Sequence, residues 1–237
     1  MNEIRQEYKE YILAHQEESL QSGTAIKEYL DDSTCCYDGK VVYTLQIPKI
    51  FTEQEITYFQ WIVKTTYRIL EKVIKEYLRN SEYRKLYPFS KELEELILVP
   101  NLYDSYLPIA RFDIFFQEDD WSFKFCEINT DGTSAMNEDY VLNMALNENN
   151  VHQEMLKKYQ FSSFELFDSW VHSFMELYQT YEKKVEHPYV VITDFMDHCC
   201  VNEFKEFANR FRKFGYEVEI CNIQSQIGRA VQQECRD

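Results

Sequence analysis

The stretch IARFDIFFQEDDWSFKFCEIN, residues 109–129, decides the fold. Both of its halves are rich in Phe and Ile, which are typical of strands, and the acidic residues Glu118, Asp119 and Asp120 separate them. The pattern predicts an antiparallel β-hairpin with strands over residues 109–117 and 121–129.

The alternation of side chains along these strands predicts where the polar residues lie. Arg111 and Asp113 share one face of the first strand, and Glu127 and Asn129 share one face of the second. With a turn over residues 118–120, Arg111 lies opposite Glu127, and both polar sets lie on a face that is otherwise lined by Phe. A turn of two or four residues would send the two sets to opposite faces.

Helices are expected on both sides of the hairpin, because apolar residues recur there at helical spacing. Gly23 is expected to end the first helix, and Thr52 with Glu55 forms a capping box for the second. A short strand is expected between these two helices, over residues 41–47. The expected helices cover residues 3–22, 52–79, 91–98, 136–147, 151–158 and 163–183.

A different organisation is expected after Pro188. Residues 189–193 form an apolar run without alternation, as in a strand buried on both faces. A helix over residues 200–214 and a strand over residues 216–220 follow, with Gly215 as the residue that ends the helix. The three elements predict a β-α-β unit.

The predicted fold class is therefore α+β, with an α/β end. A helix-rich region surrounds the hairpin sheet over residues 1–187, and a partial β-α-β unit covers residues 188–225. Residues 226–237 form a polar tail without clear periodicity.

The composition excludes several classes of function and location. With 41 acidic and 25 basic residues the net charge is −16, which argues against a nucleic-acid partner. The chain has no apolar run at its N-terminus, and nowhere does it have an uncharged apolar run of about 18 residues. We therefore expect neither a signal peptide nor a membrane partner. The adjacent pairs Cys35-Cys36 and Cys199-Cys200 do not suit a disulfide framework, and reduced thiols in the cytoplasm are expected.

The hairpin carries the candidate site. Asp113, Glu127 and Asn129 offer the hard oxygen ligands that suit Mg²⁺, and Arg111 offers a planar fork for a carboxylate or phosphoryl group.

A candidate anion-binding segment follows the hairpin. Asp131, Thr133 and Ser134 lead into a helix whose first N–H groups would hold an anion. A structural alternative stays open for both features. It is an Arg–carboxylate ion pair across the hairpin, with Asp131 or Thr133 as the helix N-cap.

The order of these residues resembles a known family. Arg111-x-Asp113, a turn and then residues 127–134, EINTDGTS, resemble the R-x-D … E-x-N-x-D-x-x-S pattern of the glutathionylspermidine synthase family. The resemblance implies an ATP-grasp fold with permuted element order, followed by a pre-ATP-grasp α/β unit, which residues 188–222 resemble.

The resemblance also implies an activity, that of an ATP-dependent carboxylate–amine ligase. In such an enzyme ATP phosphorylates a small-molecule or peptide carboxylate, and an amine captures the acyl phosphate. Carried over to this sequence, Asp113, Glu127 and Asn129 would hold Mg²⁺, and Arg111 would stabilise the phosphoryl group. Thr133 and Ser134, with Asp131, would bind substrate at the acceptor end.

The family's nucleotide-binding half would lie beyond the β-α-β unit. No G-x-x-x-x-G-K-[ST] loop is present to replace it. The expectation is therefore an N-terminal portion of such a ligase, which cannot complete the reaction alone and whose partner is the missing C-terminal half.

Two other functions remain open. One is a non-catalytic binding module whose aromatic helices pack on a partner. The other is a metal-dependent phosphodiesterase, because Asp113 followed by Glu127-x-Asn129 resembles the Asp … Glu-x-Lys arrangement of many nucleases, with Asn129 in place of the lysine.

Overall fold

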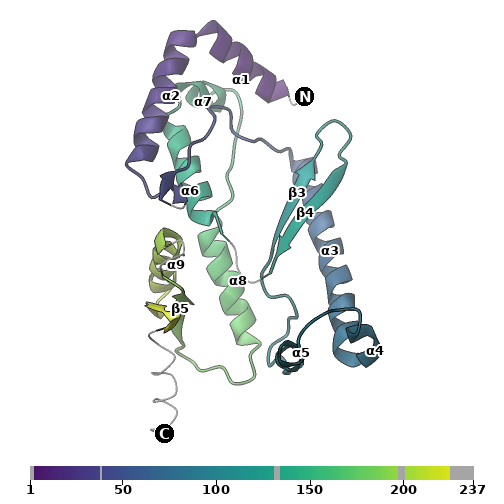
Figure 1. Ribbon diagram of the computed structural model, residues 1–237. Helices are drawn as coiled ribbons and strands as arrows, with labels where there is room; N and C mark the ends of the chain where they lie inside the picture. Colours follow the sequence, from purple (N-terminus) through teal and green to yellow (C-terminus); the bar gives the residue numbers. More distant parts are fainter. Residues whose placement is uncertain (1–2, 38, 131–133, 197–200, 225–237) are drawn as a thin grey trace. The chain divides into compact units, whose positions relative to one another are not determined.

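The computed structural model describes residues 3–37, 39–130, 134–196 and 201–224 (Figure 1). The α+β class is confirmed. The chain divides into two compact units, of which the first combines residues 1–48, 134–173 and 185–237, and the second combines residues 49–133 and 174–184. The sequence-based division at residue 188 stays a prediction.

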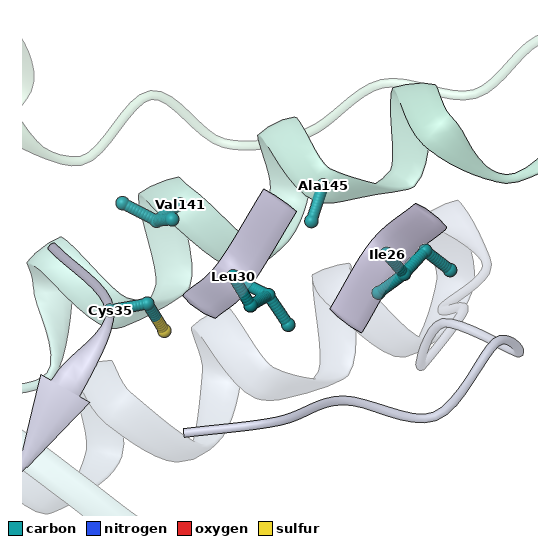
Figure 2. Packing of buried hydrophobic residues seen from close by; sticks show 5 residues of the cluster. All are labelled: Ile26, Leu30, Cys35, Val141 and Ala145. Carbon is teal, nitrogen blue, oxygen red and sulfur yellow. The ribbon is translucent and has the colours of Figure 1, made fainter. Parts of the chain in front are cut away.

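Helices dominate the first unit. They include α1 (Glu3–Ala14), α2 (Gln16–Asp31), α6 (Met136–Ala145), the 3₁₀ helix η1 (Leu146–Glu148) and α7 (Asn150–Leu156). Ile26 and Leu30 of α2 pack against Val141 and Ala145 of α6, with Cys35 in the same cluster (Figure 2). This buried cluster joins segments that lie more than a hundred residues apart in sequence.

The predicted end of the first helix at Gly23 is wrong. The break comes instead at His15, whose backbone leaves the helical region, and α2 then runs through Gly23. A Cβ atom at position 23 would lie only 2.7 Å from Nε2 of Gln46, and this amide donates a hydrogen bond of 2.7 Å to the carbonyl oxygen of Ser19. The glycine therefore serves a close approach between two segments, and it does not end a helix.

The predicted strand over residues 41–47 is much shorter than expected. Only β2 (Lys40–Val41) pairs, with β1 (Cys36–Tyr37). Beyond it the backbone bonds to side chains, since the carbonyl oxygen of Gln46 accepts a hydrogen bond of 2.7 Å from Nδ2 of the buried Asn149. An extended segment that bonds to a helix start in this way needs no neighbouring strand.

The second unit is built on one long helix and the hairpin. The helix is α3 (Glu53–Arg79), and its capping box between Thr52 and Glu55 is confirmed. The short helices α4 (Ser81–Arg84) and α5 (Lys91–Ile97) follow it. The hairpin strands β3 (Arg111–Phe116) and β4 (Phe123–Asn129) pack aromatic rings on α3, with ring centroids 4.8 Å apart for Phe59 and Phe116.

The β-α-β unit is confirmed within the first unit of the chain. β5 (Tyr189–Asp194) pairs in parallel with β6 (Glu217–Asn222), and α9 (Val201–Lys213) connects them. Gly215 follows α9 with φ at +88°, a value that favours glycine. Phe207 of α9 packs on Phe167 and on Trp170, both at the start of helix α8 (Phe167–Gln179).

The expectation that the first of these strands is buried on both faces is wrong. Tyr189 and Val191 are about half exposed, whereas Val190, Ile192 and Asp194, which alternate with the exposed positions, are partly covered. Among the described residues this sheet has two strands, and α9 packs against both. The apolar run over residues 189–193 therefore forms a strand that is covered on one face only.

The structure bears on two features of the chain, its membrane-spanning potential and the state of its cysteines. None of the helices in the described ranges has the length and apolar character needed to cross a membrane. Cys35, Cys36, Cys126 and Cys221 carry free thiols, in agreement with the prediction of reduced cysteines for these four residues. Residues 197–200, which include the second cysteine pair, lie outside the described residues.

Candidate site on the β3–β4 hairpin

The turn of the hairpin is longer than predicted. The N–H of Gln117 donates a hydrogen bond of 2.9 Å to the carbonyl oxygen of Ser122, so residues 118–121 form the loop and the predicted turn over residues 118–120 is wrong. Trp121 takes a left-handed conformation with φ at +58°. Taken alone, a loop of this length would place the two polar sets on opposite faces.

A β-bulge at Cys126 reverses that effect. From the turn, Phe116 faces Phe123 and Ile114 faces Phe125, but the next pair is Asp113 with Glu127. Cys126 is therefore an extra residue in β4, which shifts the register by one position. The prediction that the polar residues share a face is confirmed, with Arg111 opposite Asn129 rather than opposite Glu127.

Arg111 links the two carboxylates of this face. Its Nε lies 3.0 Å from Oδ1 of Asp113, and its Nη2 lies 3.7 Å from Oε1 of Glu127. Nδ2 of Asn129 donates a hydrogen bond of 3.1 Å to the same Glu127 oxygen. The four side chains, from here on the hairpin polar cluster, thus form one connected set.

The cluster is open to solvent. The side chains of Arg111, Asp113 and Glu127 are 33%, 36% and 56% exposed. Water therefore screens their mutual attraction, and such pairs contribute little to stability. It also follows that a dissolved ion or a small anion can reach these groups without any rearrangement of the backbone.

The prediction that Phe side chains line this face is wrong in large part. Phe123 packs against Tyr58 of α3, as Phe112 packs against Tyr67, so both rings lie on the opposite face. Phe115 shares the face of the cluster and is 66% exposed. The longer turn is the physical reason, because it moves residues 123 and 125 to the face that α3 covers.

The donor atoms of the cluster fit a hard cation. Asp113 and Glu127 both contact one guanidinium group, so a single small cation in its place would lie near both carboxylates. Asn129 adds an amide, and oxygen ligands of these kinds suit Mg²⁺. Among the described residues no group of three or more His, Cys, Asp and Glu is arranged to hold a metal ion.

Of the three predicted substrate-binding residues, only Ser134 lies in the described part of the chain. Asp131 and Thr133 lie outside the described residues. Ser134 is exposed and belongs to the first unit of the chain.

The start of the helix that follows these residues is already bound by the chain itself. The N–H groups of Met136 and Asn137 donate to Oε2 of Glu203 at 2.7 and 3.2 Å, and Glu203 is only 2% exposed. The expectation that these N–H groups hold an external anion is therefore wrong, because a buried carboxylate from α9 is their acceptor. Ala135 occupies the N-cap position, with φ at +67° and no side-chain hydrogen bond.

Two residues that matter here were not found from the sequence. Cys126 sits in a strand pattern that is the same with or without a bulge. Glu203 lies in the first turn of an amphipathic helix, where an acidic residue is ordinary. The role of each residue is visible only from its contacts with residues that are far away in sequence.

No protein-family model, curated protein or solved structure was found to match this chain. The resemblance to the glutathionylspermidine synthase family therefore rests on the residues quoted above and stays a prediction.

Proposed function

We propose that this chain carries the metal- and phosphate-binding part of an ATP- and Mg²⁺-dependent carboxylate–amine ligase similar to glutathionylspermidine synthase. The observation that supports the proposal best is the hairpin polar cluster, in which a bulge brings Arg111, Asp113, Glu127 and Asn129 onto one solvent-exposed face. A cytoplasmic location is part of the same proposal.

Each member of the cluster has a role in this proposal. Asp113 and Glu127, with Asn129, would hold Mg²⁺, and the bound ion would neutralise charge on the phosphates of ATP. Arg111 now contacts both carboxylates. Once a cation binds those carboxylates, the guanidinium of Arg111 is available to donate two hydrogen bonds to a phosphoryl group.

The reaction requires charge stabilisation more than covalent help. A carboxylate oxygen attacks the terminal phosphorus of ATP, ADP leaves, and an amine then displaces phosphate from the acyl phosphate to form an amide. Arg111 would stabilise the negative charge that is spread over the phosphoryl oxygens. The sequence has no G-x-x-x-x-G-K-[ST] loop.

Calorimetry of the 237-residue chain with Mg²⁺, and then with Mg-ATP, tests the proposal. We expect Mg²⁺ to bind the wild type and the Glu127→Gln variant to bind it on the order of tenfold more weakly or worse. Glu95→Gln is the matched control, because Glu95 is an exposed glutamate of α5 that pairs with Lys91 of the same helix. Equal binding by all three proteins, or no binding by any, would contradict the proposed metal site.

A further inference from the structure

The outer edge of β3 presents backbone groups to a further strand. Among the described residues β3 pairs with β4 alone. Since the N–H of Gln117 points to β4, alternation directs the N–H and C=O groups of Phe112, Ile114 and Phe116 away from β4. An open edge of this kind can accept an extended peptide as an additional strand.

An apolar groove runs along the same edge. It has a volume of about 470 Å³ and lies between Phe59, Ile62 and Val63 of α3 and Phe112, Ile114 and Phe116 of β3. Lys49, Phe51 and Phe115 also line it, and all three are substantially exposed. A strand added to β3 would bury alternate side chains in this groove while its backbone bonds to the edge.

The charges around the groove favour a basic occupant. The chain carries a net charge of −16, so a second copy would be repelled. The acidic turn residues 118–120 follow the end of β3, whereas Asp113 is paired with Arg111 on the opposite face of the strand. The single lysine that lines the groove, Lys49, already bonds to Glu118 and lies 5.5 Å from the centre of the Phe51 ring.

We propose that β3 and the adjoining groove dock an extended segment of another polypeptide, with apolar residues at alternate positions and Lys or Arg at its ends. Main-chain hydrogen bonds to Phe112, Ile114 and Phe116 supply the affinity, and the groove selects the apolar side chains. The acidic residues of the turn after β3 select the basic ends. This proposal is independent of the ligase, because it uses none of the four residues of the hairpin polar cluster.

A synthetic peptide, Lys-Val-Thr-Val-Thr-Val-Lys with a fluorophore at one end, serves as the probe in an anisotropy titration. We expect saturable binding that weakens at least tenfold when alternate backbone nitrogens are methylated, because methylation removes the edge hydrogen bonds. Replacing both lysines by glutamate is expected to weaken binding to a similar degree. Both comparisons leave the protein unchanged, so they do not depend on how a variant folds.

Two variants on α3 locate the binding site. Val63→Trp fills the groove and is expected to weaken binding at least tenfold, whereas Ile69→Trp, at a residue that is 56% exposed and does not line the groove, is expected to leave it unchanged. Equal binding of the methylated peptide, equal binding by Val63→Trp, or no binding at millimolar peptide would overturn the proposal. A dimer in sedimentation that Val63→Trp dissociates would also overturn it, with a second copy as the occupant.

Discussion

Asp113 of β3 lies directly opposite Glu127 of β4, and the two carboxylates are bridged by one guanidinium, that of Arg111. Two acidic residues at facing positions of an exposed hairpin repel each other unless a cation lies between them. In the structure this cation is the guanidinium of Arg111. In the proposed enzyme Mg²⁺ would neutralise part of the charge of the two carboxylates.

Deleting Cys126 is expected to abolish Mg²⁺ binding. Without the extra residue the register of the strand pair changes by one, and Glu127 and Asn129 turn to the face that α3 covers. Cys126→Ser keeps the residue count and is expected to bind Mg²⁺ as the wild type does. Calorimetric titration of the two variants makes the comparison, and a deletion variant with unaltered Mg²⁺ affinity would refute the role of the bulge.

Replacing Glu203 by alanine is expected to lower the free energy of unfolding by about 1–3 kcal/mol, because two buried N–H groups of α6 lose their acceptor. Glu203→Gln keeps an acceptor oxygen and should cost less. Urea unfolding followed by circular dichroism measures both. Glu206→Ala, which removes a partner of Arg210 on the same helix, serves as the control and should change little. A Glu203→Ala variant as stable as this control would argue against the capping role.

The stability of the first unit is expected to fall on acidification below about pH 6.5. Burial lowers the pKa of His152, whose Nδ1 lies 2.6 Å from the hydroxyl of the buried Tyr8. The unfolded chain then binds a proton more readily than the folded chain, so protonation favours unfolding as the pH falls through the unfolded pKa toward the lower folded value. Urea midpoints at pH 7.5 and 5.5 test this. His152→Gln should reduce the difference between them, and His187→Gln, at an exposed position, should not.

The same pair predicts a loss of stability at high pH. Burial raises the pKa of Tyr8 to about 12. The phenol of an unfolded chain ionises near pH 10, so stability that is present below that value is lost as the pH rises from about 10 toward about 12. Tyr8→Phe should flatten this part of the profile in urea unfolding, after its constant effect on packing has been subtracted. An unchanged slope would exclude Tyr8 as its source.

The effect of Gly23→Ala on the free energy of unfolding is expected to depend on the residue at position 46. In the wild type the new Cβ displaces the amide of Gln46, and the lost hydrogen bond to Ser19 offsets the helix-propensity gain of about 1 kcal/mol. In a Gln46→Ala background nothing is displaced, so the same substitution should stabilise the protein by about 1 kcal/mol. A double-mutant cycle in urea measures the coupling, and additive effects would show that the two residues do not interact.

Elements with local signals were predictable from the sequence. The capping box at Thr52 and Glu55, and Gly215 after α9, each act within a few residues, and the structure confirms both. The register of the hairpin was not predictable in this way. The additional turn residue and the bulge at Cys126 offset each other for the polar residues, and the sequence pattern of each strand shows neither of them.

The remaining errors share a physical cause. Gly23, Gln46 and Glu203 each take their role from a partner that is distant in sequence, such as Ser19 for Gln46 or Met136 for Glu203. A glycine that ends a helix and a glycine that admits a neighbouring amide look the same in a sequence. An acidic residue in the first turn of a helix likewise gives no sign that it binds the start of another helix.

The contact between Glu203 and the start of α6 also bears on the order of events during synthesis. Met136 leaves the ribosome 67 residues ahead of the carboxylate that accepts its N–H, so α6 emerges without a cap. The first unit is assembled from three separate stretches, the last of which begins at residue 185, whereas the second unit has all its residues by position 184. Translation therefore allows the hairpin unit to fold first, with the helical unit waiting for its final stretch.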